Sequence, residues 1–211
     1  MGREIFNVLD MIFQGFLEII FPKKNECLIC KEEAEGICNK CSKKIVKCEK
    51  SDISYAYYNE ELKELILLFK FRKNFNAGEV LASFLIEKLK DEKEEYILTF
   101  VPISKRKMKK RGFNQCEYLC KKAGKVLKID VIETLIQVKD VREQKTLSKQ
   151  ERSNNVKGIF KIINKEKIKN KKLILVDDVI TTGATLKECE KILKNGGIGS
   201  IKLLTIGKSD I

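Results

Sequence analysis

The residues whose types and spacing are best suited to chemistry lie in one stretch, residues 173–185, which reads LILVDDVITTGAT. Its first four residues are apolar and predict a buried strand of a parallel sheet, with Asp177 and Asp178 where that strand ends. A turn rich in threonine and glycine follows and opens a helix near Ala184. Free N–H groups at a helix N-terminus suit a phosphate, whereas two carboxylates suit sugar hydroxyls or a Mg²⁺ ion bridged to them. Together these groups describe a site for a ribose 5-phosphate.

An ordinary strand-to-helix turn with an aspartate or threonine cap is the alternative for this stretch. The hydroxyl groups around Gly183 favour the phosphate site, because Thr181, Thr182 and Thr185 add donors to those of the backbone. Other phosphate-binding patterns are missing, since the sequence contains neither GxxxxGKS/T nor GxGxxG. The run GGIG at 196–199 follows the predicted helix, so we interpret it as the turn that ends that helix.

Four of the eight cysteines, Cys27, Cys30, Cys38 and Cys41, form two CxxC pairs separated by seven residues. This spacing is typical of a metal site, because each CxxC turn presents two thiolates to one ion. Two such turns complete a tetrahedral sphere with no open position, so a bound ion is expected to be structural. Zinc is the default ion, and iron or a redox-active cysteine pair are the alternatives. The other cysteines are scattered and form no such pair: Cys48, Cys116, Cys120 and Cys189.

A basic cluster lies at residues 105–111 (KRKMKKR), which carry six cations in seven positions: Lys105, Arg106, Lys107, Lys109, Lys110 and Arg111. Phe113 and Tyr118 follow closely and offer rings for stacking on bases. Cations beside aromatic side chains are typical of sites for single-stranded DNA. The alternative is a solvated, lysine-rich loop, because lysine is spread along the whole chain and the formal charge is +13.

The composition excludes several classes of function. Histidine is absent, which removes Ser-His and Cys-His nucleophile pairs and every histidine-ligated metal site. Hydrophobic residues make up 43% of the 211 residues, which is enough for a folded core. The longest apolar runs are too short to cross a bilayer, and no secretory cleavage site or myristoylation signal is recognisable. We therefore expect a cytoplasmic protein with reduced thiols.

Hydrophobic periodicity predicts the elements that must position these groups. We expect a first domain over residues 1–50, an amphipathic helix at 4–21 followed by the cysteine module, and a second domain over residues 51–211. In the second domain the sequence predicts strands at 53–58, 96–101, 173–176 and 201–206 and helices at about 62–69, 80–89, 113–127 and 184–194. The polar stretch 139–158 is expected to form a long, mobile loop. Strands and helices alternate from residue 96 onward, so the predicted fold class is α/β, with a parallel sheet flanked by helices.

The stretch 173–185 resembles the phosphoribosyl pyrophosphate (PRPP) signature of type I phosphoribosyltransferases. Further matching segments are VPIS at 101–104, RGFNQ at 111–115, and the residues Gln144, Leu147, Arg152, Asn155, Gly158 and Phe160. With the four-cysteine module, their order is similar to that of the ComF family, specifically its ComFC-type competence proteins. The resemblance covers about residues 7–207. It implies a type I phosphoribosyltransferase-like fold with a small N-terminal zinc-ribbon-like module.

The resemblance also implies roles for individual residues. Asp177 and Asp178, as the catalytic pair, would bind the ribose hydroxyls of PRPP, which carries Mg²⁺. The remaining PRPP-binding positions would be Val179, Thr181, Thr182, Gly183, Ala184 and Thr185 around the 5-phosphate, with Lys105 and Arg106 near the pyrophosphate. The segment 139–158 would close over the ligand. Two positions depart from the family pattern, because Ser104 stands where proline is expected and Lys139 where arginine is expected.

The resemblance implies a protein of DNA uptake in natural transformation. Its ligands would be PRPP and single-stranded DNA, and its partners a helicase of the same operon or other competence proteins. It leaves open whether the protein is an enzyme, because no base-reading site is recognisable in the sequence. The alternative is an active phosphoribosyltransferase of nucleotide salvage, a reaction that depends on positioning and electrostatics more than on a strong base.

Overall fold

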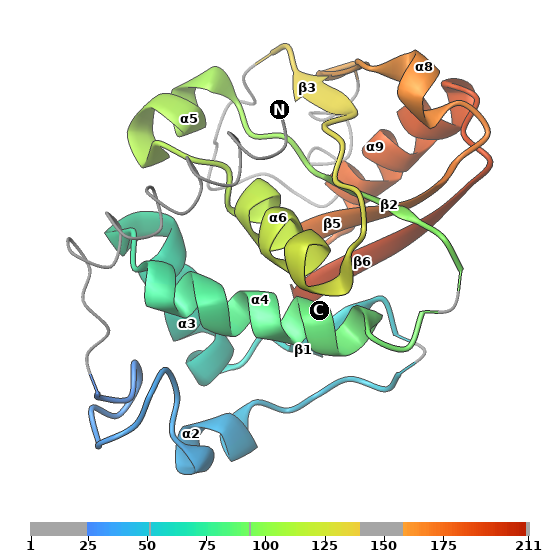
Figure 1. Ribbon diagram of the computed structural model, residues 1–211. Helices are drawn as coiled ribbons and strands as arrows, with labels where there is room; N and C mark the ends of the chain where they lie inside the picture. Colours follow the sequence, from blue (N-terminus) through green and yellow to red (C-terminus); the bar gives the residue numbers. More distant parts are fainter. Residues whose placement is uncertain (1–24, 51, 93, 140–157, 210–211) are drawn as a thin grey trace, which may run out of the picture.

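The computed structural model describes residues 25–50, 52–92, 94–139 and 158–209. The predicted helix at 4–21 and nearly all of the predicted loop at 139–158 lie outside these residues. At the centre is a four-stranded parallel sheet with the strand order β1-β6-β5-β2 (Figure 1). The strands are β1 (Ser54–Tyr57), β2 (Ile97–Phe100), β5 (Lys172–Ile180) and β6 (Ser200–Lys208). The predicted parallel α/β architecture is confirmed.

Helices cover both faces of the sheet. One face carries α3 (Glu60–Arg72), α4 (Phe75–Leu89) and α6 (Gln115–Leu127), and the other carries α9 (Ala184–Asn195) (Figure 1). Both faces of an inner strand are therefore buried, which explains the unbroken apolar run of β5 at residues 173–176. In the residues that the structure describes, no helix has the length and apolar character needed to cross a membrane.

Alternation along β5 divides its side chains between two hydrophobic clusters. Ile174 and Val176 pack with α3, α4 and α6, whereas Leu173 and Leu175 pack with α9. Continuing this alternation directs Asp178 toward the first cluster and Asp177 toward the second. The side chains of these two neighbouring aspartates therefore leave the strand on opposite faces of the sheet.

Strand β5 is longer than predicted, because it runs through both aspartates instead of ending at Val176. The pairing with β6 continues to the end of β5, with Asp177 opposite Thr205 and Val179 opposite Gly207. On its other side the pairing with β2 ends where Phe100 lies opposite Val176. The aspartates therefore lie beyond the end of one neighbouring strand while the other neighbour holds their backbone in place.

The basic cluster forms a helix, α5 (Lys105–Arg111), which the sequence analysis did not predict. Its ends are defined by the Ser104 hydroxyl, which accepts the Lys107 N–H at 3.2 Å, and by Gly112, whose φ of 86° ends the helix. Helix α6 begins at Gln115, two residues later than predicted, because the Asn114 side chain caps it by accepting the Cys116 N–H at 2.9 Å.

A separate pair of short antiparallel strands was not predicted. Strands β3 (Leu135–Gln137) and β4 (Phe160–Ile162) pair with each other and lie beside α9, and the short helix α8 (Lys165–Ile168) follows β4 (Figure 1). Three residues per strand are too few to show a period of two. In the sequence, the stretch 139–158 lies between these two strands.

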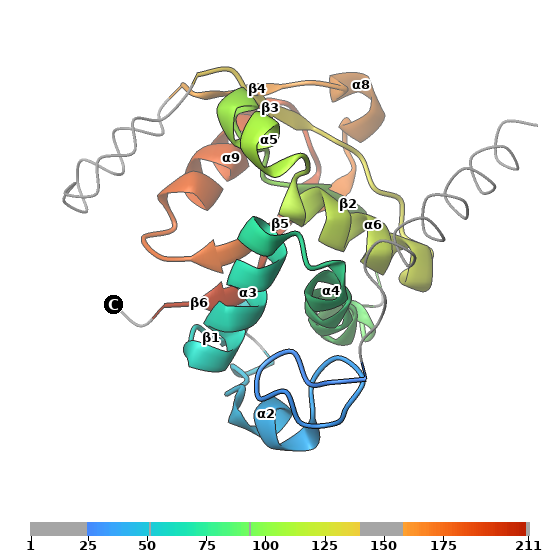
Figure 2. The ribbon, with the colours of Figure 1, turned by 90° about the vertical axis from the view of Figure 1, so that its left-hand side faces the viewer.

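The cysteine module packs under α3 and α4 (Figure 2). Its described part, residues 25–50, contains the short helix α2 (Asn39–Lys44). Ile29 and Ile45 contact the large hydrophobic cluster, and the chain after α2 pairs with β1, where the Cys48 N–H donates to the Tyr55 carbonyl at 2.9 Å. The module is therefore attached both to α3 and to the edge of the central sheet.

Candidate functional site

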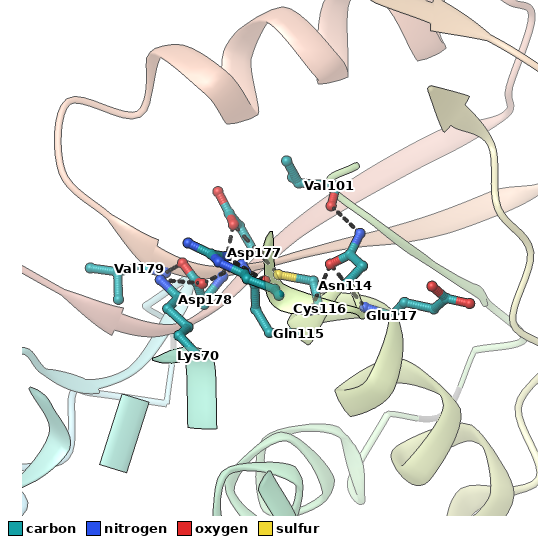
Figure 3. Close-up of polar contacts among 10 residues, drawn as sticks. Lys70, Val101, Asn114, Gln115, Cys116, Glu117, Asp177, Asp178 and Val179 are labelled. Carbon is teal, nitrogen blue, oxygen red and sulfur yellow. Dashed lines mark hydrogen bonds and ion pairs between the residues drawn. The ribbon is translucent and has the colours of Figure 1, made fainter. Parts of the chain in front are cut away.

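The two aspartates lie at the carboxyl end of β5, where three elements converge (Figure 3). Lys70 approaches from α3, and Gln115 and Cys116 approach from the first turn of α6 (Figure 3). Ligands bind at this edge of α/β sheets, because the strands end there and the following loops can surround a ligand. The structure thus places the predicted pair at the expected edge, together with three side chains that the sequence analysis did not assign to it.

Asp178 is almost fully engaged by neighbouring groups. One oxygen, Oδ2, pairs with the Lys70 ammonium at 2.5 Å and accepts the Gln115 side-chain N–H at 2.8 Å. The other oxygen, Oδ1, accepts the Val179 N–H at 2.7 Å. Only 8% of Asp178 is exposed. A carboxylate has about four lone-pair positions, so three of those on Asp178 are already used.

The Lys70–Asp178 ion pair is stable because each charge offsets the cost of burying the other. Burial alone raises the pKa of Asp178, but Lys70, Gln115 and the Val179 N–H outweigh it and hold this pKa below its ordinary value. Burial lowers the pKa of Lys70, but Asp178 outweighs it and raises this pKa above its ordinary value. Both groups are therefore charged at neutral pH.

Asp177 has a different environment. Its Oδ1 accepts the Asp178 N–H at 2.8 Å and faces the Cys116 thiol at 3.6 Å, and the side chain is half-buried. Burial and the negative charge of Asp178 raise the pKa of Asp177 to about 7. Asp177 therefore holds a proton at higher pH than an ordinary aspartate and is suited to exchange it with a bound hydroxyl or amine.

Cys116 completes a group of three potential metal ligands, because its sulfur and a carboxylate oxygen of Asp177 and of Asp178 lie within 4.8 Å of one another. Burial, followed by the charges of Asp178 and Asp177, raises the pKa of Cys116 well above its ordinary value. The thiol therefore keeps its proton and donates to Asp177. Because Lys70 already neutralises Asp178, this group is not suited to hold a metal through a thiolate.

The segment Arg111–Gln115, which the sequence analysis quoted as RGFNQ, connects the site to its surroundings. The Arg111 guanidinium donates to the Gln115 side-chain oxygen at 2.8 Å, and Gln115 donates onward to Asp178. The Asn114 side chain donates to the Val101 carbonyl at 3.0 Å while it caps α6. The segment thus fixes the end of β2, the start of α6 and the orientation of the Asp178 carboxylate.

The turn from Thr181 to Thr185 leads directly from β5 into α9. Gly183 has a φ of 71° and precedes the first residue of α9, and a Cβ atom there would lie 3.3 Å from the Ile180 side chain. The Ala184 N–H donates weakly to the Thr182 hydroxyl at 3.4 Å. Thr181 is exposed, and Thr182 and Thr185 are half-buried. The turn therefore presents hydroxyl groups and first-turn N–H groups at the same edge as the carboxylates.

The other residues that the sequence analysis singled out lie on different elements. Lys105 and Arg106 lie exposed at the start of α5. Phe113 and Tyr118, expected as stacking platforms, instead pack against Phe69, with ring centroids 5.0 and 5.1 Å away. Both residues are half-buried, so they contribute to the edge of the core. The quoted residues Gln144, Leu147, Arg152 and Asn155 lie outside the described part of the chain.

Lys70 is the most important site residue that the sequence analysis did not identify, because it pairs directly with Asp178. It follows Leu62 and Ile66 at intervals of four, so it continues the buried stripe of α3. A lysine on such a stripe requires an acidic partner, and this signal was present in the sequence. The sequence does not identify the partner, because Asp178 is more than 100 residues away along the chain.

A hollow of about 340 Å³ lies elsewhere, between the cysteine module and the start of α3. Its lining residues are Ile29, Glu60, Glu61, Lys63, Glu64 and Leu67. Three carboxylates and one ammonium give it a negative balance, which disfavours a phosphorylated ligand. The end of β5 therefore remains the better candidate site for a phosphorylated ligand.

The four cysteines predicted to bind a metal are brought together in space, and their sulfur atoms all lie within 4.8 Å of one another. Cys30 and Cys38 have sulfur atoms 3.5 Å apart, and the Cys38 N–H donates to the Cys27 sulfur at 3.4 Å. An ion at ~2.3 Å from each sulfur would separate the sulfurs by about 3.8 Å in a tetrahedron. The donor set and its spacing therefore fit one tetrahedral metal ion.

Comparisons with known proteins agree with this geometry. Residues 116–208 match the phosphoribosyl transferase domain family. Competence protein F of Haemophilus influenzae is 31% identical over 180 residues, covering 82% of this chain and 78% of that protein. Competence protein ComFC of Streptococcus pneumoniae is 33% identical over 150 residues, covering 71% of this chain and 64% of that protein.

Among solved structures, glutamine PRPP amidotransferase from B. subtilis has a TM-score of 0.46 and 15% identity, over 66% of this chain and 30% of that one. The domain match begins at Cys116 and includes the whole of β5, the Thr181–Thr185 turn and α9. The central sheet and its flanking helices thus form a type I phosphoribosyltransferase-like fold. The identity to competence protein F extends over most of both chains. The chain belongs to the ComF family.

Proposed function

We propose that this protein binds PRPP together with Mg²⁺ at the carboxyl end of β5. The observation that carries the proposal is the continuous path from Asp177 and Asp178 through Thr181–Thr185 into α9, at the edge where β2 has already ended. The turn supplies hydroxyl and N–H donors for the 5-phosphate, and the carboxylates accept from the ribose hydroxyls. When bound, Mg²⁺ would neutralise charge on the pyrophosphate.

The two carboxylates have unequal roles in this proposal. Asp177 is half-buried and has the less crowded carboxylate, so it is the first acceptor for a ribose hydroxyl. Asp178 is paired with Lys70, and this pair fixes the end of β5 against α3. Asp178 can accept a further hydroxyl only at its remaining lone-pair position or after Lys70 moves. Asp177→Asn is therefore expected to weaken PRPP binding more directly than Asp178→Asn.

Calorimetric titration with PRPP and Mg²⁺ tests the proposal. The informative variants are Asp177→Asn and Thr182→Val, and Asp130→Asn is the matched control because Asp130 is exposed in the loop after α6. Asp178→Asn is combined with Lys70→Met, so that no unpaired charge remains buried. We expect each site variant to lose at least tenfold in affinity while the control retains it. Equal affinity in all variants would refute the proposed site.

We further propose that the protein acts in DNA uptake and contacts single-stranded DNA through α5. The supporting observations are the names of the relatives, competence protein F and ComFC, and the six cations that α5 carries within two turns. Helix α5 lies at the same end of the molecule as the end of β5 (Figure 2). Replacing Lys109 and Lys110 by glutamine should weaken DNA binding and reduce its salt dependence by about 0.7 in log–log slope per lost phosphate contact. An unchanged slope would exclude α5 as the contact surface.

A second candidate function is transfer of the phosphoribosyl group to a nitrogen nucleophile. In that reaction the nucleophile bonds to ribose C1, the bond from C1 to the pyrophosphate oxygen breaks, and pyrophosphate leaves. The pKa of about 7 at Asp177 favours this function, because a base with this pKa can accept the proton that the nucleophile releases. Pyrophosphate release in a screen of nucleobases tests it. Release by the wild type and its loss in Asp177→Asn is the expected result for a transferase.

We propose zinc as the ion of the four-cysteine module, within a metal-stabilised domain over residues 1–50 that is distinct from residues 51–211. Burial raises the pKa of the Cys27 thiol, but the backbone N–H groups of Cys38, Cys30 and Ile29 outweigh it and help to lower this pKa to about 6, which supports thiolate charge. Metal analysis of the purified protein should give one zinc per chain. Absence of stoichiometric metal from protein whose cysteines are reduced would contradict the proposal.

A further inference from the structure

An exposed aromatic ring lies next to the candidate site. Phe71 follows Lys70 at the end of α3, and 56% of it is exposed. It is the one aromatic residue among the exposed large hydrophobic residues of the described chain. The rings of Phe69, Phe113 and Tyr118, by contrast, pack on one another. Phe71 therefore presents an aromatic face that a ligand from solution can reach.

The neighbour on the described surface is Arg111. Its guanidinium lies over the Phe71 ring, with Cζ 5.2 Å from the ring centroid. Arg111 also donates to Gln115 at 2.8 Å, and Gln115 donates to Asp178 at 2.8 Å. A continuous series of contacts therefore runs from the exposed ring to the carboxylates. Lys70, the residue before Phe71, pairs with Asp178. Phe71 is therefore connected to Asp178 on two sides, through Arg111 and Gln115 and through Lys70, and this holds it near the site.

We propose that Phe71, together with Arg111, forms a stacking surface for a nucleobase. The aromatic face binds a planar base by stacking, and the guanidinium can stack with the base or donate to its oxygen and nitrogen acceptors. Met108, also exposed, precedes Arg111 by three residues and therefore lies on the same side of α5. The position of the base beside PRPP rests on the proposed function, but the stacking itself does not. The base is supplied either free in solution or as part of a single strand of DNA.

The chain offers a spectroscopic test because it contains no tryptophan. Phe71→Trp introduces a single fluorophore into the proposed surface, and a stacked base quenches indole fluorescence. Val126→Trp is the matched control, because Val126 is also exposed, at 61%, but lies near the far end of α6, about 16 Å along the helix from Gln115. The ligands are free nucleobases, an oligothymidine strand, and a strand of the same length without bases.

We expect quenching of Phe71→Trp by free bases, by the oligothymidine strand or by both, and none in Val126→Trp. Quenching by free bases identifies an acceptor subsite, and quenching by the strand alone identifies DNA as the source of the base. The strand without bases should leave the fluorescence unchanged even where α5 binds its phosphates. Absence of quenching by every ligand, or equal quenching of both variants, would overturn the proposal.

An affinity measurement separates this proposal from the proposed PRPP site. Phe71→Ala should lose about 5- to 150-fold in affinity for the base-bearing ligand, the range expected for one stacked base. The same variant should keep wild-type affinity for PRPP with Mg²⁺, because Phe71 is not one of the residues proposed to bind the ribose or its phosphate. If the wild type does not bind PRPP, the proposed PRPP site is refuted, whereas the result on base stacking still holds. Unchanged affinity of Phe71→Ala for bases and for the strand would refute the stacking surface.

Discussion

The Lys70–Asp178 ion pair supports a quantitative prediction about stability. The two side chains are 17% and 11% exposed, so each charge depends on the other for its solvation. Removing one partner of a buried pair costs about 3–5 kcal/mol, because an uncompensated charge remains in a poorly solvated place. In Lys70→Met the Asp178 carboxylate retains the N–H groups of Gln115 and Val179. We therefore expect a loss near the lower end of this range, about 3 kcal/mol.

Urea unfolding of four proteins measures this loss: the wild type, Lys70→Met, Asp178→Asn and the double variant. In thermal unfolding of the same proteins, each single variant should have a Tm about 6–12 °C lower, as expected for a loss of about 3 kcal/mol in a chain of this size. The double variant should lose about 2 kcal/mol less unfolding free energy than the two single variants together, because neither charge is then left unpaired. Lys63→Met is the control, since Lys63 is exposed on the same helix and its removal should change stability by no more than about 0.5 kcal/mol.

Strict additivity in this cycle would refute the assigned ion pair. Two single variants with losses below about 0.5 kcal/mol would also refute it, because such values are typical of exposed pairs. In either case Asp178 would be free to meet a ligand, and its role would become equivalent to that of Asp177.

Three other predictions concern the pH dependence, the metal and the helix cap. Because the folded-state pKa of Asp177 is raised from 3.8 to about 7, the folded state holds a proton that the unfolded state releases, so stability should fall by up to about 4 kcal/mol as pH rises from 4 to 8. Asp177→Asn should remove this slope in urea unfolding, and an identical slope in the variant would contradict the assignment. Chelation or Cys41→Ser should unfold the cysteine module, seen as loss of amide protection in residues 25–50 by hydrogen exchange while β5 stays protected. Asn114→Ala should cost about 2 kcal/mol, since it removes both the α6 cap and a buried bond to Val101, and a change below about 0.5 kcal/mol would contradict this role.

The sequence was sufficient to predict those parts of the fold that local signals specify. The apolar run before Asp177 predicts an inner strand, Gly183 and the threonines predict the turn, and GGIG predicts the end of α9 at Gly196. The spacing of the four cysteines predicts their cluster, because a CxxC turn brings its two sulfurs together through local geometry alone. In each case a few neighbouring residues carry the whole signal.

Features that depend on distant partners were not predictable in this way. The length of β5 beyond Val176 depends on its register with β6, and the ion pair of Lys70 depends on a residue far along the chain. Helix α5 was not predicted because six cations in seven residues give no apolar period, although Ser104 and Gly112 provide an N-cap and a C-cap. The packing of Phe113 and Tyr118 against Phe69 was likewise not predicted, because Phe69 lies more than 40 residues earlier in the chain.

The resemblance and the structure contribute different parts of the account of RGFNQ. The resemblance to the ComF family singled out the segment without a physical reason for it. The structure supplies that reason, because Asn114 joins β2 to α6 while Arg111 and Gln115 orient Asp178. The same contacts link the exposed ring of Phe71 to the site. A segment that is polar and short can therefore determine the geometry of the whole edge of the sheet.

The most direct test of the central claim is the affinity of PRPP with Mg²⁺ for the wild type and for Asp177→Asn, measured by calorimetry at pH 8, where Asp177 is ionised. The account predicts saturable binding to the wild type with one site per chain and at least a tenfold loss in the variant. Binding of equal strength to both proteins would contradict the assignment of this carboxylate to the sugar.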